Sequence, residues 1–344
     1  MKKLILPTFK KLKQRFYLKD FDQKFLDDTK NFCKNIFMKR QLNKLIVFTG
    51  PCSIHNPEEA ILYAKKLKNL QKKLKNIVLI MRVYFEKPRS QNSWKGFLYD
   101  PNLDGSFDIK NGIEKVRKLL IDITKMQVPI ATEILDPNAF LYFDDLISWG
   151  FIGARTSASQ IHRQIASKIS IPVGFKNPID GDVNTAIDAA IVAKSSQNFI
   201  SLNEDSKICQ ISSKGNLLSH IVLRGSKKTI NYDKKSLDQT LKLMKDKKES
   251  FPIVIDCSHG NAQNDYTSQI KAFKFSINSI IEKKYPIIAL MLESNLIQGN
   301  QIFNPLHLRY GLSITDPCID FETTENLILE ADEKLRLQTH HHLR

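Results

Sequence analysis

The sequence lacks both a membrane-spanning stretch and a secretion signal. No apolar run approaches the roughly 18 residues needed to cross a bilayer. The basic start, MKKLILPTFKKLKQRF, has an apolar part that already ends at Leu6 and Pro7, and no small-residue cleavage site follows it. The sequence therefore predicts a protein without membrane contact, located in the cytoplasm.

Cysteine is also scarce. The chain has five cysteines, an odd number without regular spacing, so the sequence predicts reduced thiols rather than a disulfide framework. Cys33 and Cys209 are typical of buried cysteines that pack as small apolar side chains, and His162 is typical of a histidine whose hydrogen bonds are satisfied. Cys257 lies inside the apolar run of a predicted strand and should point into a helix–sheet interface.

Repeats of roughly 20–50 residues and low-complexity segments are absent. The net charge is nevertheless +16, which fits either a protein that binds nucleic acid or membranes, or an enzyme for anionic substrates. Lysines occur throughout the chain, including the exposed helix face expected for residues Tyr63–Lys75. Because this spread does not form a patch and charge alone is weak support, we expect no nucleic-acid partner.

What the sequence does contain is a regular alternation of short apolar strands and amphipathic stretches, beginning at Leu45. The strand candidates are Leu45–Thr49, Ile77–Val83, Pro129–Ile134, Phe151–Arg155, Ile171–Lys176, His220–Arg224, Pro252–Cys257 and Pro286–Glu293. The helical candidates between them include Pro57–Leu74, Asn111–Lys125, Ala139–Trp149 and Ser159–Lys168. Such alternation indicates a parallel sheet covered by helices. Eight units over about 270 residues fit a (β/α)8 TIM barrel better than an open sheet.

The chain of 344 residues is longer than a barrel of roughly 250 residues, so we expect an extension. Residues 1–44 are predicted to form an N-terminal arm or helix used in regulation or oligomerisation. Residues 45–335 are predicted to form the catalytic barrel, and residues 336–344 a tail. Residues 198–213 resemble a hairpin inserted between strands five and six, which serves either regulation and assembly or no special purpose.

Cations recur where predicted strands end, and the segment Met81–Gly96 is the densest example. Reactive groups of such barrels collect at the carboxyl ends of the strands. The cations at these ends are Arg82, Lys87, Arg89, Arg155, Lys176 and Arg224. A surface ion pair could explain any one of them, but together they would repel one another unless an anion of high charge lay between them. The sequence therefore predicts a site for two phosphorylated small molecules.

A second set of strand-end residues has the chemistry of metal ligands. Its members are Cys52, His259, Glu293 and Asp316. A thiolate, an imidazole and two carboxylates suit a divalent ion of the Mn, Fe, Co or Zn class, although the spacing matches neither CxxC nor HExxH. In addition, Ser157 and Gln160 have the spacing of a capping box, which predicts a helix N-terminus whose amides add to the phosphate site.

Nine segments in order resemble the type I 3-deoxy-D-arabino-heptulosonate 7-phosphate (DAHP) synthases. They are GPCSIHNPEEA, RVYFEKPRS, WKGFLYDPNLDGSF, GARTSASQIHRQIAS, PVGFKNPIDG, HIVLRG, IDCSHGNAQ, ESNLIQGNQ and YGLSITDPCI. The resemblance implies a (β/α)8 barrel and a metal-dependent transferase. That enzyme condenses phosphoenolpyruvate with erythrose 4-phosphate at the entry to the shikimate pathway and aromatic amino-acid biosynthesis. It also implies a homodimer or homotetramer and an aromatic amino acid as possible inhibitor.

Motif by motif, the resemblance implies a role for each strand-end residue. Phosphoenolpyruvate would be held by Arg82, Lys87, Arg155, Lys176 and Arg224, with Glu133 and the amide of Ala154 nearby. Erythrose 4-phosphate would meet Arg89 and Ser90, and one divalent metal ion would bind Cys52, His259, Glu293 and Asp316. Lys87 is the candidate proton donor, with a pKa lowered by neighbouring cations, while His259 is a candidate proton shuttle and Cys52 is catalytic through the metal.

The sequence departs from the family pattern at a few places. Ser90 replaces a threonine, which should keep the phosphate contact. The pair Pro178-Ile179 replaces Gly-Thr, which should stiffen that loop. Changes at Phe140-Leu141 and in the hairpin loop Asn203–Lys207 leave feedback control open. The alternatives are a related synthase that uses arabinose 5-phosphate, a basic scaffold that binds nucleic acid, and an active enzyme whose regulatory arm has decayed.

Overall fold

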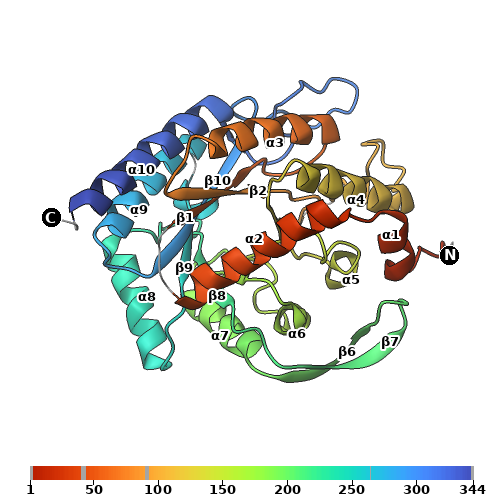
Figure 1. Cartoon of the computed structure of the whole chain (residues 1–344), viewed down its shortest axis with the longest axis horizontal. Helices are drawn as coiled ribbons and strands as arrows, with labels where there is room; N and C mark the ends of the chain where they lie inside the picture. The colour runs from red at the N-terminus through yellow and green to blue at the C-terminus, as the bar shows by residue number, and fades with distance from the viewer. Residues whose placement is uncertain (1–2, 40–43, 90–92, 264, 342–344) are drawn as a thin grey trace.

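The computed structural model describes residues 3–39, 44–89, 93–263 and 265–341 and forms a closed parallel barrel (Figure 1). The strands pair in the order β1-β2-β3-β4-β5-β8-β9-β10, and β10 pairs with β1 to close the ring. The predicted (β/α)8 barrel is therefore confirmed. The strands are β1 Leu45–Gly50, β2 Ile77–Arg82, β3 Ile130–Glu133, β4 Trp149–Ile152, β5 Val173–Lys176, β8 Ser219–Leu223, β9 Ile253–Asp256 and β10 Ile287–Asn295.

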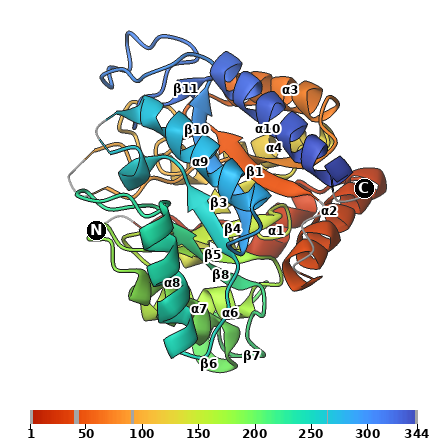
Figure 2. The same ribbon diagram turned by 90° about the vertical axis from the view of Figure 1, so that its left-hand side faces the viewer.

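Helices surround the barrel, as Figure 2 shows from the side. They are α3 Pro57–Gln71, α4 Ile109–Lys125, α5 Pro137–Phe140, α6 Gln160–Lys168, α7 Val183–Lys194, α8 Lys234–Asp246, α9 Gln269–Ile281 and α10 Phe321–His341. Short elements, η1 His259–Asn261, η2 Tyr266–Ser268 and β11 Ile319–Asp320, follow strand ends. Apolar strand residues facing outward pack on the helices, and Cys257 belongs to this layer as predicted. Inside the barrel, Phe48 meets Trp149 and Phe151 edge to face at 5.1 and 5.0 Å.

The helix predicted for Ala139–Trp149 is wrong. Only the single turn Pro137–Phe140 is helical, and Trp149 already begins β4. The chain between them forms turns because its polar groups bond to other elements. The guanidinium of Arg117 donates to the carbonyl of Tyr142 at 2.8 Å, and the Tyr142 hydroxyl donates to the carbonyl of Pro7 at 2.7 Å. The amides of Phe143 and Leu146 donate to the carbonyls three residues earlier, so the backbone forms turns rather than a continued helix.

The predicted capping box is also wrong. Helix α6 begins at Gln160 with Ser159 in the N-cap position, and the Ser159 side chain makes no capping hydrogen bond. The Ser157 hydroxyl instead donates to the carbonyls of Gly153 and Lys176, which joins the ends of β4 and β5. His162 bonds Ser159 and the carbonyl of Leu135, so the prediction that its ring is satisfied is confirmed.

The N-terminal extension forms two helices, α1 Phe9–Arg15 and α2 Asp20–Lys39, and Figure 1 shows α2 crossing in front of the barrel. Cys33, Ile36 and Phe37 of α2 pack into the inner core of the barrel. The Phe37 ring lies 5.3 Å from the ring of His220, near the start of β8. Helix α2 therefore covers the amino ends of the strands, opposite the predicted site.

The predicted inserted hairpin is present as β6 Gln197–Leu202 and β7 Ile208–Ser213, which pair antiparallel. Figure 1 shows it curving away from the barrel toward α1. At its tip the amide of Lys10 donates to the carbonyl of Glu204 at 3.0 Å, and the amide of Phe9 donates to the Ser206 hydroxyl at 3.2 Å. Cys209 is only half-buried on this hairpin, so the prediction that it packs in the interior is wrong.

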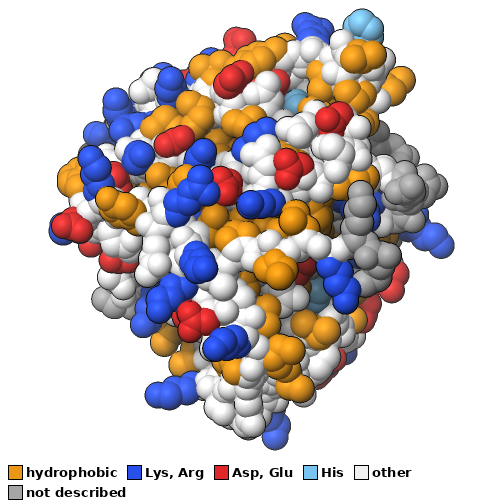
Figure 3. Space-filling view, turned by 90° about the vertical axis from the view of Figure 1, so that its right-hand side faces the viewer, with side chains coloured by type: hydrophobic (Ala, Val, Ile, Leu, Met, Phe, Trp, Pro, Cys, Tyr) orange, Lys and Arg blue, Asp and Glu red, His pale blue; other side chains and the backbone are white. Residues whose placement is uncertain are grey.

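No helix in the described ranges is both long enough and apolar enough to cross a membrane. Figure 3 shows lysines and arginines distributed over one face of the molecule, with apolar and acidic side chains between them. On this face the positive charge is dispersed, as the sequence suggested, rather than collected into one basic surface.

Candidate active site

A cavity of about 660 Å³ opens at the carboxyl ends of the barrel strands. Most predicted site residues line it: Lys87, Arg89, Glu133, Ala154, Arg155, Lys176, Arg224, His259, Glu293 and Asp316. Arg82 and Cys52 are fully buried and do not line this cavity, and Ser90 lies outside the described residues. The closed ring of strands thus brings side chains from distant parts of the sequence to one place.

Glycines allow the strand ends to approach closely. A Cβ atom on Gly50, at the end of β1, would lie 2.6 Å from the carbonyl oxygen of Arg82. A Cβ atom on Gly153, after β4, would lie 2.1 Å from the Glu133 carboxylate. Both distances are shorter than any van der Waals contact, so these two positions require glycine for Arg82 and Glu133 to keep their places.

Three predicted metal ligands meet in one cluster. The ligand atoms of Cys52, Glu293 and Asp316 lie within 4.8 Å of one another, and the Cys52 thiol contacts an Asp316 carboxylate oxygen at 3.4 Å. His259 adjoins the cluster, because its Nε2 atom lies 3.5 Å from Glu293 Oε1. Its other ring nitrogen, Nδ1, lies 2.9 Å from Asp256 Oδ2, which orients the ring.

The electrostatics of this cluster suit a divalent cation. Burial and the charge of Glu293 raise the pKa of the Cys52 thiol to about 12, against the opposing effect of Lys87. Burial would also raise the pKa of Asp316, but Lys87 and His259 lower it below its usual value. A buried carboxylate, an exposed carboxylate and a buried thiol in contact favour neutralisation by a positive charge, which a divalent metal ion would supply.

Three of the six strand-end cations are buried with acidic or thiol partners, so groups of the protein offset part of the charge that the sequence analysis assigned to a bound anion. Arg82 bonds Glu293 at 2.8 Å, Lys176 bonds Asp256 at 2.8 Å, and the Lys87 ammonium contacts Cys52 Sγ at 3.0 Å. The lowered pKa predicted for Lys87 is wrong for the same reason. Burial lowers the pKa of Lys87, but Cys52, Asp316 and Glu293 outweigh burial and raise it overall.

Arg155 and Arg224 remain candidates for binding an anion. Both line the cavity, and Arg155 is exposed while Arg224 is half-buried. Burial lowers the pKa of Arg224, and the nearby charge of Arg155 lowers it further, against the effect of Asp256. Two guanidinium groups close enough to oppose each other's charge form a site for phosphate or carboxylate oxygens.

Sequence reasoning missed two residues of the site. Asp256 contacts both His259 and Lys176. Burial would raise the pKa of Asp256, but these two neighbours lower it well below its usual value. Its position three residues before His259 at a strand end was the available signal. Tyr84 packs its ring 4.1 Å from the Arg82 guanidinium and lines the cavity. The Tyr84 hydroxyl and Arg82 Nε are buried without a hydrogen-bond partner. These two polar groups can therefore bond to a ligand or a water molecule in the cavity.

Comparison with known proteins identifies the fold and the family. The Tyr-sensitive phospho-2-dehydro-3-deoxyheptonate aldolase of Escherichia coli (strain K12) is 40% identical over 337 residues, covering 97% of this chain and 94% of that protein. The phospho-2-dehydro-3-deoxyheptonate aldolase of Corynebacterium glutamicum is 39% identical over 303 residues, covering 86% of this chain and 82% of that protein. A Trp-sensitive relative from Buchnera aphidicola is 41% identical over 287 residues, covering 83% of this chain and 82% of that protein.

A solved structure agrees with these relatives. The phospho-2-dehydro-3-deoxyheptonate aldolase from Francisella tularensis SCHU S4 has a TM-score of 0.92 and 40% identity, covering 96% of this chain and 98% of that chain. A family model, described as the DAHP synthetase I family, matches residues 34–329. This span contains all eight barrel strands and the candidate active site. The chain belongs to the DAHP synthetase I family.

Proposed function

We propose that the cavity at the carboxyl ends of the barrel strands binds two phosphorylated substrates next to each other, with a divalent metal ion beside them. As a member of its family the chain is a DAHP synthase, a transferase that condenses phosphoenolpyruvate with erythrose 4-phosphate and water. The products are 3-deoxy-D-arabino-heptulosonate 7-phosphate and phosphate, at the first step of the shikimate pathway. The observation that carries the proposal is the cluster of Cys52, Glu293 and Asp316 beside the pair Arg155 and Arg224 in one cavity.

Phosphoenolpyruvate occupies the side of the cavity that Arg155 and Arg224 line. Their guanidinium groups bind its phosphate, and the amide of Ala154 lies beside them. Lys176 and Lys87 bind the carboxylate, and Arg82 adds positive charge from below. Because Lys176 is held by Asp256 and Lys87 by Cys52, these ammonium groups keep their positions before the substrate arrives. Glu133 faces the same space and can position a water molecule.

Erythrose 4-phosphate binds on the side of the cavity formed after β2. Arg89 lines this side, and its Nε atom is fixed by donating to the carbonyl of Trp94 at 2.9 Å. The remaining guanidinium nitrogens are the natural partners of the sugar phosphate, and Ser90 would add a hydroxyl. This places the aldehyde end of the sugar toward Lys87 and the metal ligands, and next to C3 of phosphoenolpyruvate.

The residues that would hold a divalent metal ion are Cys52, His259, Glu293 and Asp316. When bound there, such an ion supplies Lewis acidity toward the aldehyde oxygen of erythrose 4-phosphate. The chain itself prepares the ligands: Asp256 holds the His259 ring through Nδ1, which leaves Nε2 directed at Glu293.

In the reaction, C3 of phosphoenolpyruvate forms a bond to the aldehyde carbon while water adds at C2, and the C2 centre then loses phosphate to give the ketone. Lys87 donates a proton to the new alkoxide. Its raised pKa keeps the ammonium form charged at neutral pH, so the proton is in place when the alkoxide forms. The proton released by the attacking water can go to Glu133, which lines the same cavity. His259, whose Nε2 atom would bind the metal, can pass a proton only from Nδ1 to Asp256.

The choice of aldose phosphate tests this function directly. Consumption of phosphoenolpyruvate should be rapid with erythrose 4-phosphate and at background level with arabinose 5-phosphate. Arg89, held by Trp94, favours the shorter sugar in this account. Preference for arabinose 5-phosphate would instead establish the related synthase. A salt-dependent shift of DNA in a gel without turnover would favour the basic scaffold.

Regulation and assembly are part of the proposal. The relatives named above include Tyr-sensitive and Trp-sensitive enzymes. We propose that this chain also responds to an aromatic amino acid, through the N-terminal arm and the hairpin tip that contacts α1. We further propose a homodimer or homotetramer that uses these same elements, because Ile200 and Ile208 of the hairpin are 80% and 79% exposed. Activity titrations with each aromatic amino acid and sedimentation measurements test both points.

A further inference from the structure

We infer that Phe303, a residue outside the cavity lining, positions the binding site for the aldose phosphate. It does so by stacking on Trp94, whose carbonyl holds Arg89. This inference rests on the proposed function, because it concerns how Arg89 is held for the sugar phosphate. None of the residues predicted for the site lies next to Phe303 in the sequence. The inference therefore gives a role to a loop that had none.

The first step is that the two cations after β2, Arg89 and Lys87, are hydrogen-bonded to the backbone of residues 94 and 95. Arg89 donates from Nε to the carbonyl of Trp94 at 2.9 Å, and the amide of Lys87 donates to the carbonyl of Lys95 at 2.9 Å. The backbone at residues 94–95 thus supports a cation on each side of the proposed sugar site. Movement of Trp94 would displace the Arg89 guanidinium, whereas Lys87 stays attached to Lys95 through its amide and to Cys52 through its ammonium group.

The second step is the setting of Trp94 itself. Its side chain is 7% exposed, and the indole donates to the carbonyl of Asp100 at 3.1 Å. The Phe303 ring stacks on it with 6.4 Å between ring centroids and 27° between ring planes. Stacked aromatic pairs at such distances prefer defined mutual orientations, so Phe303 limits how the indole can tilt.

The third step is the rigidity of the loop that carries Phe303. The side-chain amide of Gln301 donates to the carbonyls of Arg309 and Leu312 at 3.0 and 2.8 Å and accepts from the Arg309 amide at 2.8 Å. Gln301 therefore bridges the loop from within. Ile302 is 92% exposed and Leu306 85% exposed, whereas Phe303 is 37% exposed against Trp94.

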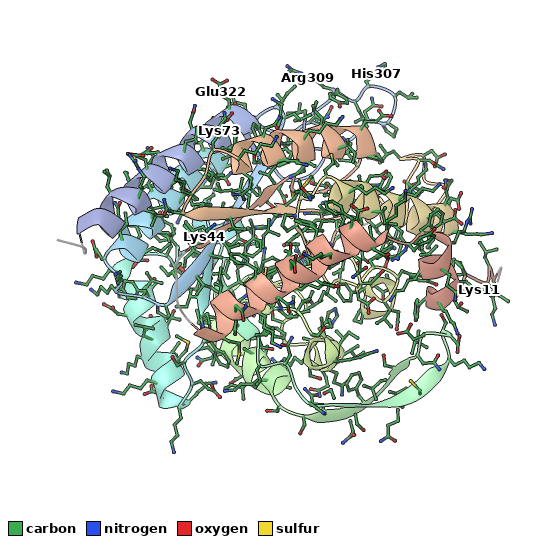
Figure 4. All side chains as sticks on the ribbon, viewed as in Figure 1. Lys11, Lys44, Lys73, His307, Arg309 and Glu322 are labelled. Carbon is green, nitrogen blue, oxygen red and sulfur yellow. The ribbon has the colours of Figure 1, made fainter. Side chains whose placement is uncertain are left out.

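The outer side of this loop faces solvent. Figure 4 shows the labelled side chains of His307 and Arg309 projecting from the edge of the molecule, away from the barrel. The stacked ring of Phe303 is therefore the aromatic contact that this loop makes with the segment after β2. The loop is also bonded to the chain that follows it, since the side-chain amide of Asn300 donates to the carbonyl of Thr315 at 3.0 Å.

The stacked rings connect two segments that each support a different part of the proposed site. The loop with Phe303 continues to Asp316 in the metal cluster, while the segment with Trp94 supports Arg89. Stacking of the two rings joins the sugar-phosphate side of the cavity to the metal side. The distance between the sugar phosphate and the aldehyde is fixed by the substrate, so a fixed spacing between Arg89 and the cluster favours one length of sugar.

The test compares Phe303→Ala with wild type in steady-state kinetics. Loss of the stacked ring should raise the KM for erythrose 4-phosphate roughly 3- to 10-fold, because such pairs contribute modest free energies. The KM for phosphoenolpyruvate and kcat should stay within about twofold, since Arg155 and Arg224 are untouched. Phe303→Tyr should restore the wild-type KM, and Leu306→Ala, an exposed neighbour in the same loop, is the matched control.

A second readout does not depend on turnover. The chain has two tryptophans, and Trp149 is enclosed in the barrel core, so a red shift of fluorescence in ligand-free Phe303→Ala reports exposure of Trp94. Phe303→Leu serves as the milder change if the alanine variant does not fold. Unchanged kinetics and fluorescence, or equal increases in both KM values, would overturn the inference. Wild-type protein that does not consume erythrose 4-phosphate would overturn the proposed function instead.

Discussion

At the scale of single residues, the site depends on charges that are buried together with their partners. Arg82, Lys87 and Lys176 each contact an acidic group or thiol, whereas Arg155 and Arg224 lie close enough to oppose each other. The first three residues are therefore fixed parts of the protein. Arg155 and Arg224 line the cavity where an anion would bind, which makes them informative positions for mutation.

We predict that Arg155→Ala and Arg224→Ala each raise the KM for phosphoenolpyruvate roughly 10- to 100-fold, the effect of losing a charge-assisted hydrogen bond. The KM for erythrose 4-phosphate should change little. Lys95→Ala is the control, since Lys95 belongs to the same basic segment but its side chain does not line the cavity. A rise confined to the KM of the sugar phosphate would mean that the two phosphate sites are assigned the wrong way round.

Glu86 gives a prediction about pH and stability. Burial and the charge of Asp136 raise the pKa of Glu86 to about 8, although the Tyr99 hydroxyl donates to it at 3.2 Å. A carboxyl group with a raised folded-state pKa binds its proton more tightly when folded. Its contribution is therefore complete below the unfolded pKa of about 4.5 and is lost as pH rises toward 8.

We predict that wild-type protein loses up to about 1.4 kcal/mol of unfolding free energy per pH unit from this group between pH 5 and 8. Glu86→Gln keeps an acceptor for Tyr99 but cannot ionise, so its stability should depend less on pH over that range. Urea denaturation at pH 5, 6.5 and 8 measures the difference. Parallel curves for the two proteins would show that Glu86 does not titrate in this way.

At the scale of elements, the strands could be predicted well and the segment after β3 could not. All eight barrel strands were found from apolar runs, because a strand buried on both faces must be apolar throughout. The false helix at Ala139–Trp149 arose because its apolar residues are also spaced like a helix face. The buried Arg117 that binds the Tyr142 carbonyl lies 25 residues earlier in sequence, so no local pattern could reveal it.

The residues of the candidate site could be predicted from the sequence, but the contacts between their side chains could not. Residues at strand ends were identified individually, since parallel strands place their ends at one edge. The partners that set their charge state, such as Asp256 for Lys176, depend on which strands are neighbours and how side chains lean. The lowered pKa expected for Lys87 is wrong because its ammonium group contacts Cys52, which lies 35 residues earlier, so no local pattern connects the two residues.

Helix α2 provides a prediction at this scale. Phe37 of α2 is 5% exposed and packs against His220 at the amino ends of the strands. Phe37→Ala should lower the free energy of unfolding by about 3 kcal/mol, the usual cost of removing a buried aromatic ring. Phe21→Ala, on the same helix but at a position 69% exposed, should have almost no effect. Equal stability of both variants would mean that α2 does not seal the barrel.

At the scale of the whole molecule, the two ends of the barrel differ, because one is filled by apolar side chains and the other opens into the cavity. The N-terminal extension closes one end with apolar side chains, and the loops at the other end assemble the cavity. The hairpin and α1 lie beside the barrel and contact each other without entering the cavity. Under our proposal, regulation and assembly therefore use surfaces that are separate from the residues of the candidate active site.

The most direct test of the central claim is an assay of phosphoenolpyruvate consumption with erythrose 4-phosphate, with EDTA and after return of single metals. EDTA should abolish turnover, and at least one of Mn²⁺, Fe²⁺, Co²⁺ or Zn²⁺ should restore it. Cys52→Ala, which removes one member of the cluster, should keep its fold by circular dichroism and stay inactive with every metal. Full activity of Cys52→Ala in metal-free buffer would contradict the account.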